Sequence, residues 1–286
     1  MEIVSPITFA FSILGSLVTT QPTSLFGILN SGPTARSKLA SLSTPTKILA
    51  SLYLIHYMNR STISCLRTPQ ARSPMHLIIP IASIYFNLCN GTLMGSWLGG
   101  RTSAVTARTG AVPEAALYSP FFYIGVAMWF FGFLGNLVSD EVLYDLRRPT
   151  EDGKKAPRYS IPYGFLYTKP LGGISFPAYF CEWIEWLGFA IAACSHSSAP
   201  AFPALGGHNS EASLAEAGRI LAQSGGLPYT RNKLLDLGTY ATPPFMFLFA
   251  EVATMLPRAI KGHQWYKVKF RGEFPKERKA VIPGVL

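Results

Sequence analysis

The chain has 286 residues, of which 49% are hydrophobic and only 14% are charged. Soluble domains carry about 25% charged residues, so this composition excludes an ordinary soluble domain and favours a membrane protein. The net charge of +10 is compatible with nucleic acid binding, but the basic residues flank apolar segments, which is typical of proteins at a membrane surface. We therefore predict no nucleic acid partner.

Six apolar windows follow one another along the chain. A membrane-spanning helix needs about 20 mostly apolar residues. Residues 75–98 and 116–138 meet this requirement without a charged side chain, and shorter or less pure windows cover 3–20, 45–59, 176–194 and 238–256. We predict an all-α fold, a polytopic transmembrane helical bundle with about six spans, formed by a single domain over residues 1–286.

Three acidic residues lie inside the less pure windows. They are Glu182 and Glu185 in the fifth window and Glu251 in the sixth. A carboxylate at membrane depth is costly, so each of these residues is a functional-site candidate.

The distribution of basic residues predicts the orientation. With six spans, the N-terminus, the 60–74 and 139–175 loops and the C-terminal tail lie on one side, and most of the 25 Lys and Arg residues are there. Basic loops face the cytosol, so this side is predicted to be cytosolic. Residues 195–237 are predicted to form an extramembrane insert, and residues 257–286 a basic cytosolic tail.

The four cysteines show no paired spacing. They are Cys65, Cys89, Cys181 and Cys194, and three of them lie in apolar stretches. We interpret them as packing thiols and predict neither a disulfide framework nor a metal site.

A polar stripe marks the cytosolic end of the fourth window. Asn136, Asp140, Leu143 and Arg147 are spaced by four, three and four residues, which places them on one face of a helix. The stripe is either an ordinary charged end of a membrane helix or a ligand site. In the second case Asp140 accepts hydrogen bonds and Arg147 holds a phosphate.

Three other polar groups are predicted on the same side. They are His56-Tyr57-x-x-Arg60, the pair Glu182 and Glu185, and His263 to Tyr266 in the tail. Each group alone is also explained as boundary residues of a membrane helix. Together they predict a cytosolic pocket for one polar anionic ligand and one apolar ligand.

Several ordered motifs resemble the steroid 5α-reductase family (3-oxo-5α-steroid 4-dehydrogenases). The motifs are Asn136-x-x-Ser139-Asp140-x-x-Leu143-x-x-Leu146-Arg147, Tyr159-x-Ile161-Pro162-x-Gly164, Glu182-x-x-Glu185-Trp186-x-Gly188, His263-x-Trp265-Tyr266 and Pro275-x-x-Arg278-Lys279-Ala280-x-Ile282-Pro283. His56-Tyr57-x-x-Arg60 resembles the motif with the family's catalytic tyrosine, and Glu2-Ile3-Val4-Ser5-Pro6 the segment with its catalytic glutamate.

The resemblance implies a multi-pass oxidoreductase of the endoplasmic reticulum membrane that uses NADPH. The implied reaction of lipid or steroid metabolism reduces a carbon-carbon double bond conjugated to a ketone in a steroid-like lipid, with the active-site face and the C-terminus cytosolic. Tyr57, hydrogen-bonded to Glu2, is implied to donate to the carbonyl oxygen. The implied cofactor-binding residues are Arg60, Arg72, Asn136, Asp140, Arg147, Tyr159, Glu182, Arg258, His263 and Tyr266. No obligate protein partner is implied.

Two positions depart from the family pattern. Phe165 replaces a glycine and Ala178 replaces an asparagine that contacts the cofactor. The family's seven-helix bundle also has a helix ahead of the glutamate, so the resemblance implies that Met1 interrupts a longer protein that has lost this first helix.

Four other functions stay open. Within the superfamily these are a polyprenol reductase and a very-long-chain enoyl-CoA reductase. A membrane isoprenylcysteine methyltransferase shares a similar helical layout but uses S-adenosylmethionine, and the stripe of Asn136, Asp140 and Arg147 argues against it. The last is a non-catalytic descendant of the family, which the two departures and the missing first helix motivate.

Overall fold

The computed structural model describes residues 2–15, 39–68, 76–100, 112–148, 159–170, 172–195 and 241–286. Over these ranges the chain is helical, and its only β-structure is two isolated bridges. The predicted all-α class is therefore confirmed. Arg72 and most of the predicted insert, residues 196–237, lie outside the described residues.

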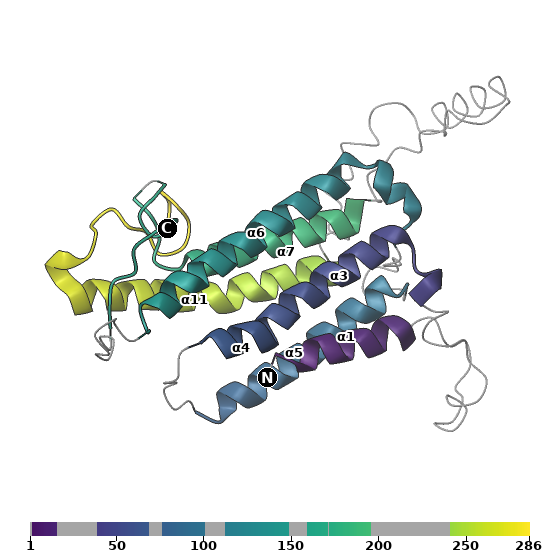
Figure 1. Ribbon diagram of the computed structural model, residues 1–286, viewed down its shortest axis with the longest axis horizontal. Helices are drawn as coiled ribbons and strands as arrows, with labels where there is room; N and C mark the ends of the chain where they lie inside the picture. The colour runs from purple at the N-terminus through teal and green to yellow at the C-terminus, as the bar shows by residue number, and fades with distance from the viewer. Residues whose placement is uncertain are drawn as a thin grey trace, which may run out of the picture.

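Each of the six apolar windows overlaps one of the main helices (Figure 1). The helices are α1 (Val4–Gly15), α3 (Thr44–Met58), α5 (Ile78–Leu98), α6 (Pro120–Asp145), α7 (Pro177–Cys194) and α11 (Pro243–Phe270). Four short elements accompany them: η2 (Asn59–Ile63), α4 (Ser64–Arg67), η3 (Glu114–Tyr118) and η5 (Arg271–Glu273). η2 is a π-helical turn that continues α3 directly, a type of turn found often at functional sites.

Two of these helices, α5 and α6, are long and apolar enough to cross a membrane. The prediction of about six spans is therefore not confirmed by helix length and composition. α1 and α3 have 12 and 15 residues, which is short of the 20 or so that a span needs. α7 has 18 residues, but Glu182 and Glu185 reduce its hydropathy.

Glycines bring two pairs of helices into close contact. A Cβ atom at Gly132 of α6 would lie 2.5 Å from the backbone nitrogen of Glu185, so only glycine permits the approach of α7. On α5, Gly91 and Gly95 form a G-x-x-x-G motif against α1, where a Cβ at Gly95 would lie 2.5 Å from the Phe9 carbonyl oxygen. Figure 1 shows both pairs side by side.

An aromatic cluster joins these pairs at the centre of the bundle. Tyr53 of α3 stacks on Phe9 of α1 with ring centroids 4.1 Å apart. Trp186 of α7 lies edge-on to Tyr53 at 5.9 Å and to Phe247 of α11 at 4.6 Å. Because these rings are buried, they hold α1, α3, α7 and α11 in one fixed arrangement.

The C-terminal segment differs from the predicted tail of residues 257–286. α11 continues through Pro257 to Phe270, so the first half of this range is helix. The chain then turns back at Arg271, and the Ser175 amide donates to the Lys279 carbonyl over 2.9 Å while the Lys279 amide donates to Gly173 over 3.0 Å. The end of the chain therefore packs beside the segment that leads into α7 (Figure 1).

Candidate functional site

A cavity of about 490 Å³ lies between α3, η2, α5, α7 and α11, with Glu2 ahead of α1 at its edge. Its polar lining consists of Glu2, His56, Tyr57, Arg60, Ser83, Asn87, Glu182, Glu251, Thr254 and Arg258. Its apolar lining consists of Ile78, Ile79, Ala82, Phe86 and Met255. The predicted convergence of Glu2, the end of α3, the start of α7 and Arg258 is therefore observed.

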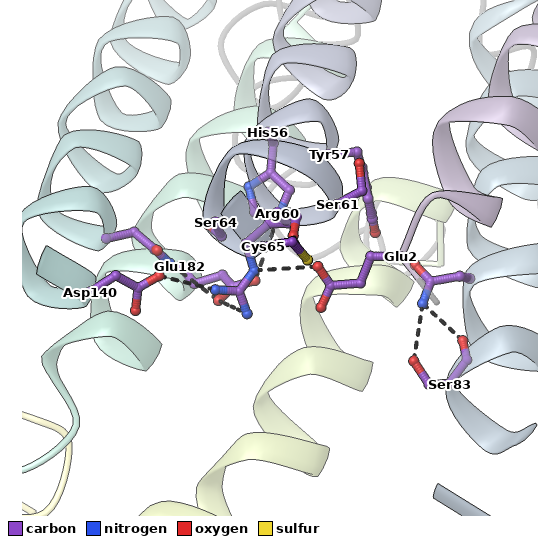
Figure 2. A network of polar contacts seen from close by, with 12 residues as sticks. Glu2, His56, Tyr57, Arg60, Ser61, Ser64, Cys65, Ser83, Asp140 and Glu182 are labelled. Atoms are coloured by element: carbon purple, nitrogen blue, oxygen red, sulfur yellow. Dashed lines mark hydrogen bonds and ion pairs between the residues drawn. The ribbon is translucent and has the colours of Figure 1, made fainter. Parts of the chain in front are cut away.

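Arg60 is the centre of the polar side. Its Nε atom lies 3.8 Å from Glu2 Oε2, its Nη1 atom 3.3 Å from Asp140 Oδ2 and its Nη2 atom 4.0 Å from Glu182 Oε2. Figure 2 shows the guanidinium between Glu2 on one side and Asp140 and Glu182 on the other. One cation therefore compensates three carboxylates that come from α6, α7 and the residues preceding α1.

Asn136 and Asp140 both face this group, as their helical spacing predicted. The Asn136 side-chain amide donates to Glu182 Oε2 over 3.2 Å and to the Ala178 carbonyl over 3.4 Å. Arg147, the third polar member of the predicted stripe, lies in the turn after the end of α6 at Asp145. The helical spacing therefore does not extend to Arg147.

His56 adds a buried contact that was not predicted from sequence. Its Nδ1 atom lies 2.7 Å from Glu185 Oε1, and its Nε2 atom 3.7 Å from Glu182 Oε1. The side chains of His56 and Glu185 are almost fully buried. The sequence identified Glu185 as a costly buried acid and His56 as part of a motif. Spacing along one helix cannot show that side chains from two different helices are in contact.

The Tyr57 hydroxyl has a different partner from the expected one. Asn90 of α5 donates to the Tyr57 oxygen over 2.6 Å and to the Tyr53 oxygen over 2.9 Å. The expected hydrogen bond with Glu2 is not formed, because the Glu2 carboxylate faces the positive charge of Arg60. Both Glu2 and Tyr57 nevertheless line the same cavity. Asn90 lies in the apolar window 75–98, and its amide side chain was the sequence signal that could have identified it.

Three of the predicted cofactor residues lie in a second cluster around the end of α11. Tyr159 contacts Trp265 with ring centroids 5.1 Å apart, and Tyr266 stacks on Phe274 at 5.8 Å. The His263 Nδ1 atom lies 2.8 Å from the Ser175 hydroxyl. The predicted set thus divides between the cavity and this aromatic cluster.

Arg278 lies at the centre of the second cluster and was not among the predicted site residues. Its side chain is 1% exposed, and none of its three nitrogens has a hydrogen-bond partner among the described residues. The guanidinium carbon lies 5.5 Å from the centre of the Tyr163 ring and 5.3 Å from that of Phe274. The motif Pro275-x-x-Arg278 was its sequence signal.

Burial changes the protonation of this cluster. Loss of hydration lowers the pKa of Arg278 and, together with the charges of Lys267, Arg278 and Lys279, lowers the pKa of His263 to about 4. Burial raises the pKa of Tyr266. At neutral pH His263 is therefore uncharged, and Arg278 is a cation without a counter-ion, which is a suitable place for an anionic group.

The departures at Phe165 and Ala178 leave the local backbone intact. Gly164 has φ +139° and Leu166 has φ +64°, whereas Phe165 has no positive φ and is 64% exposed. The lost glycine is therefore not needed for the turn. At Ala178 the asparagine side chain is lost, but the carbonyl still accepts from Asn136.

Comparison with known proteins identifies similar sequences along most of the chain. The sequence model of a family described as 3-oxo-5-alpha-steroid 4-dehydrogenase matches residues 73–205 and 235–286. An uncharacterized protein of Schizosaccharomyces pombe, C9.08c, is 32% identical over 296 residues, 99% of this chain and 81% of that protein.

Characterised proteins are more distant. The 3-oxo-5-alpha-steroid 4-dehydrogenase 1 of Rattus norvegicus is 27% identical over 252 residues, 88% of this chain and 71% of the relative. The steroid 5-alpha-reductase DET2 of Arabidopsis thaliana is 26% identical over 250 residues, 86% of this chain and 72% of the relative.

Proposed function

Because the chain belongs to the 3-oxo-5-alpha-steroid 4-dehydrogenase family, we propose that it reduces a carbon-carbon double bond conjugated to a ketone in a steroid-like lipid, with NADPH as the reductant. The observation that carries this proposal is the cavity. Tyr57, whose hydroxyl can donate a hydrogen bond, lines this cavity together with apolar residues of α5 and with Arg60. The rat and Arabidopsis relatives, named for steroid 5α-reduction, support the choice of substrate class.

The residues of the second cluster fit an anionic cofactor. Arg278 supplies a buried cation whose nitrogens have no partner among the described residues, and the ring of Tyr266 lies in the same cluster. We propose that Arg278, Tyr159, His263 and Tyr266 hold the phosphate-bearing part of NADPH. Arg60, Asn136, Asp140, Glu182 and Arg258, with Arg147 and Arg72, are proposed to hold the rest. When bound, NADPH supplies the hydride that adds to the β-carbon of the enone.

Tyr57 is proposed to stabilise the negative charge that develops on the ketone oxygen. Its oxygen accepts from Asn90, and the residue lines the cavity, where the O–H can turn to donate to the ketone oxygen of a ligand. A donor aimed at a developing oxyanion is worth about 100- to 1,000-fold in rate. Glu2 is proposed to support this end of the site through Arg60, and the α-carbon takes its proton from solvent.

The outer surface supports a multi-pass membrane protein. Large apolar side chains are exposed on helices besides α5 and α6, for example Phe11 on α1, Ile55 on α3 and Phe249 on α11. Many large exposed apolar side chains on several helices are expected where lipid tails contact a protein. We propose about six spans in the endoplasmic reticulum membrane, with the cavity opening and the C-terminus cytosolic.

The test is an activity assay of the purified protein in detergent. NADPH oxidation is measured with 3-oxo-Δ4 steroids, polyprenals and enoyl-CoAs, and methyl transfer from S-adenosylmethionine is measured in parallel. We expect oxidation with a steroid enone and a rate that falls about 100- to 1,000-fold in Tyr57→Phe. Tyr85→Phe, at an exposed tyrosine of α5, is the matched control.

Three results contradict the proposal. Binding of NADPH without oxidation with any acceptor indicates a non-catalytic family member. Oxidation only with polyprenals or enoyl-CoAs assigns the protein to another branch of the superfamily. An unchanged steroid rate in Tyr57→Phe removes the role proposed for this tyrosine.

A further inference from the structure

One carboxyl group in the cavity has no role in the proposed reduction. Glu251 of α11 is 8% exposed and lines the cavity together with Tyr57 and Phe86. No hydrogen bond or ion pair joins its carboxyl group to another residue in the described part of the chain, whereas Glu2, Glu182 and Glu185 each have one. The buried Glu251 carboxyl group is therefore free to bind a ligand in the cavity.

Glu251 lies on the α11 side of the cavity, within electrostatic reach of Glu182, Arg60 and Arg258. Glu251, Met255 and Arg258 are four and three residues apart, so they follow one another along the same helix face, and all three line the cavity. At 1.5 Å per residue, Glu251 lies about 10 Å along the axis from Arg258. The cavity wall on α11 thus presents an acidic, an apolar and a basic side chain in turn.

Such a carboxyl group is expensive to keep in an apolar wall. At 8% exposure Glu251 has lost most of its contact with water, which costs a carboxyl group free energy that Leu or Met would not lose at this position. The polar groups of the neighbouring α5 wall do not offset the cost, since the Asn87 amide is taken up by the Ser83 carbonyl at 2.8 Å. The carboxyl group lines the open volume of the cavity, where a ligand can supply its partner.

We infer that Glu251 forms a subsite for a hydroxyl group of the lipid substrate. A hydroxyl donates to an ionised carboxylate and accepts from a protonated acid, so it satisfies Glu251 in either state. An ammonium needs the ionised form and a carbonyl the protonated one, and an ammonium also loses much more hydration on entering an apolar cavity. The inference rests on the proposed reduction and deepens it by assigning the recognition of a substrate hydroxyl group to Glu251.

Equilibrium binding of labelled steroids in detergent tests the subsite without requiring catalysis. The probes are a 3-oxo-Δ4 steroid without a hydroxyl group and a set of its mono-hydroxylated positional isomers. We expect the wild type to bind at least one isomer about 10-fold more tightly than the parent compound. Glu251→Leu should remove this preference and leave binding of the parent compound within about threefold of the wild type. A tenfold difference in affinity corresponds to about 1.4 kcal/mol, which is the size of one hydrogen bond.

Two variants control for folding and for the general polarity of the cavity. Glu251→Gln keeps shape and hydrogen bonding and should retain part of the preference. Thr254→Val changes a residue of the same helix that lines the same cavity, and whose hydroxyl donates only to the Glu251 backbone carbonyl, so the preference should persist.

The inference is overturned if no isomer binds better than the parent, or if Glu251→Leu weakens the parent as much as every isomer. Weaker NADPH binding in Glu251→Leu with an unchanged steroid preference also overturns it, because the carboxyl group then serves the nicotinamide carboxamide. A wild type that prefers a hydroxylated steroid but oxidises no NADPH contradicts only the proposed reduction.

Discussion

Two arginines, one in the cavity and one in the second cluster, have contrasting surroundings. Arg60 lies within 4.0 Å of carboxylate oxygens from three residues, and its side chain is 25% exposed. Arg278 is 1% exposed and contacts the rings of Tyr163 and Phe274, with no hydrogen-bond partner among the described residues. The same side chain is thus fully compensated in one place and uncompensated in the other.

The difference indicates how each arginine affects the stability of the protein before a ligand binds. Arg60 holds carboxylates from separate helices together, so its charge stabilises the folded protein. Arg278 has lost its hydration without gaining an anion, so it lowers the stability of the free protein and becomes favourable when an anion arrives. Arg60 is expected to matter most for folding and Arg278 most for cofactor binding.

The largest effect is expected for Arg60→Met. The substitution leaves Glu2, Asp140 and Glu182 without their cation, which should reduce the free energy of unfolding by about 3–5 kcal/mol. Thermal unfolding in detergent measures it. Arg67→Met, which removes only a pair with Glu141 at the exposed surface, should cost less than about 1 kcal/mol. Equal losses in the two variants would falsify the central role of Arg60.

Arg278→Met should have the opposite pattern. Loss of a charge-assisted contact worth about 2 kcal/mol should weaken NADPH binding about 30-fold. The melting temperature should stay the same or rise, because an uncompensated buried charge has been removed. Isothermal titration with NADPH measures the affinity, and exposed Lys276→Met is the control. Unfolding of Arg278→Met with unchanged NADPH affinity would show a purely structural arginine.

Gly132→Ala tests the Arg60 side without removing a charge. The new Cβ would lie 2.5 Å from the Glu185 nitrogen, so α7 must move away from α6 and Glu182 away from Arg60. Overpacking of this kind should cost about 1–3 kcal/mol in thermal unfolding. At Gly272 a Cβ would meet nothing within 4 Å, so Gly272→Ala should cost much less. A Gly132→Ala protein as stable as Gly272→Ala contradicts the close packing.

The smallest effect is a pH dependence at His263 beside Arg278. Burial and the nearby cations lower the pKa of His263 to about 4, against 6.5 in an unfolded chain. As the pH falls below 6.5 the unfolded chain binds the proton first, so stability should fall by about 1 kcal/mol between pH 7 and 5.5. Thermal unfolding across this range should lose that slope in His263→Gln and keep it in His76→Gln, at an exposed histidine. A slope retained in His263→Gln assigns it to another group.

The helices themselves were largely predictable from sequence. Apolar windows such as 116–138 predicted α6, because an uninterrupted apolar run of this length indicates a helix. The face shared by Asn136 and Asp140 was predicted for the same reason. The continuation of α11 to Phe270 was not, since its last turns are rich in charge.

By itself the sequence determined the all-α class, the family motifs and the residue types that line the site. Only the tertiary structure decided the partners: Glu2 faces Arg60 instead of Tyr57, His56 meets Glu185, and Arg278 and Glu251 have none among the described residues. Spacing along one helix is a local property that fixes which residues share a face. Which carboxylate reaches a guanidinium depends on how several helices pack, and glycines such as Gly132 set that distance.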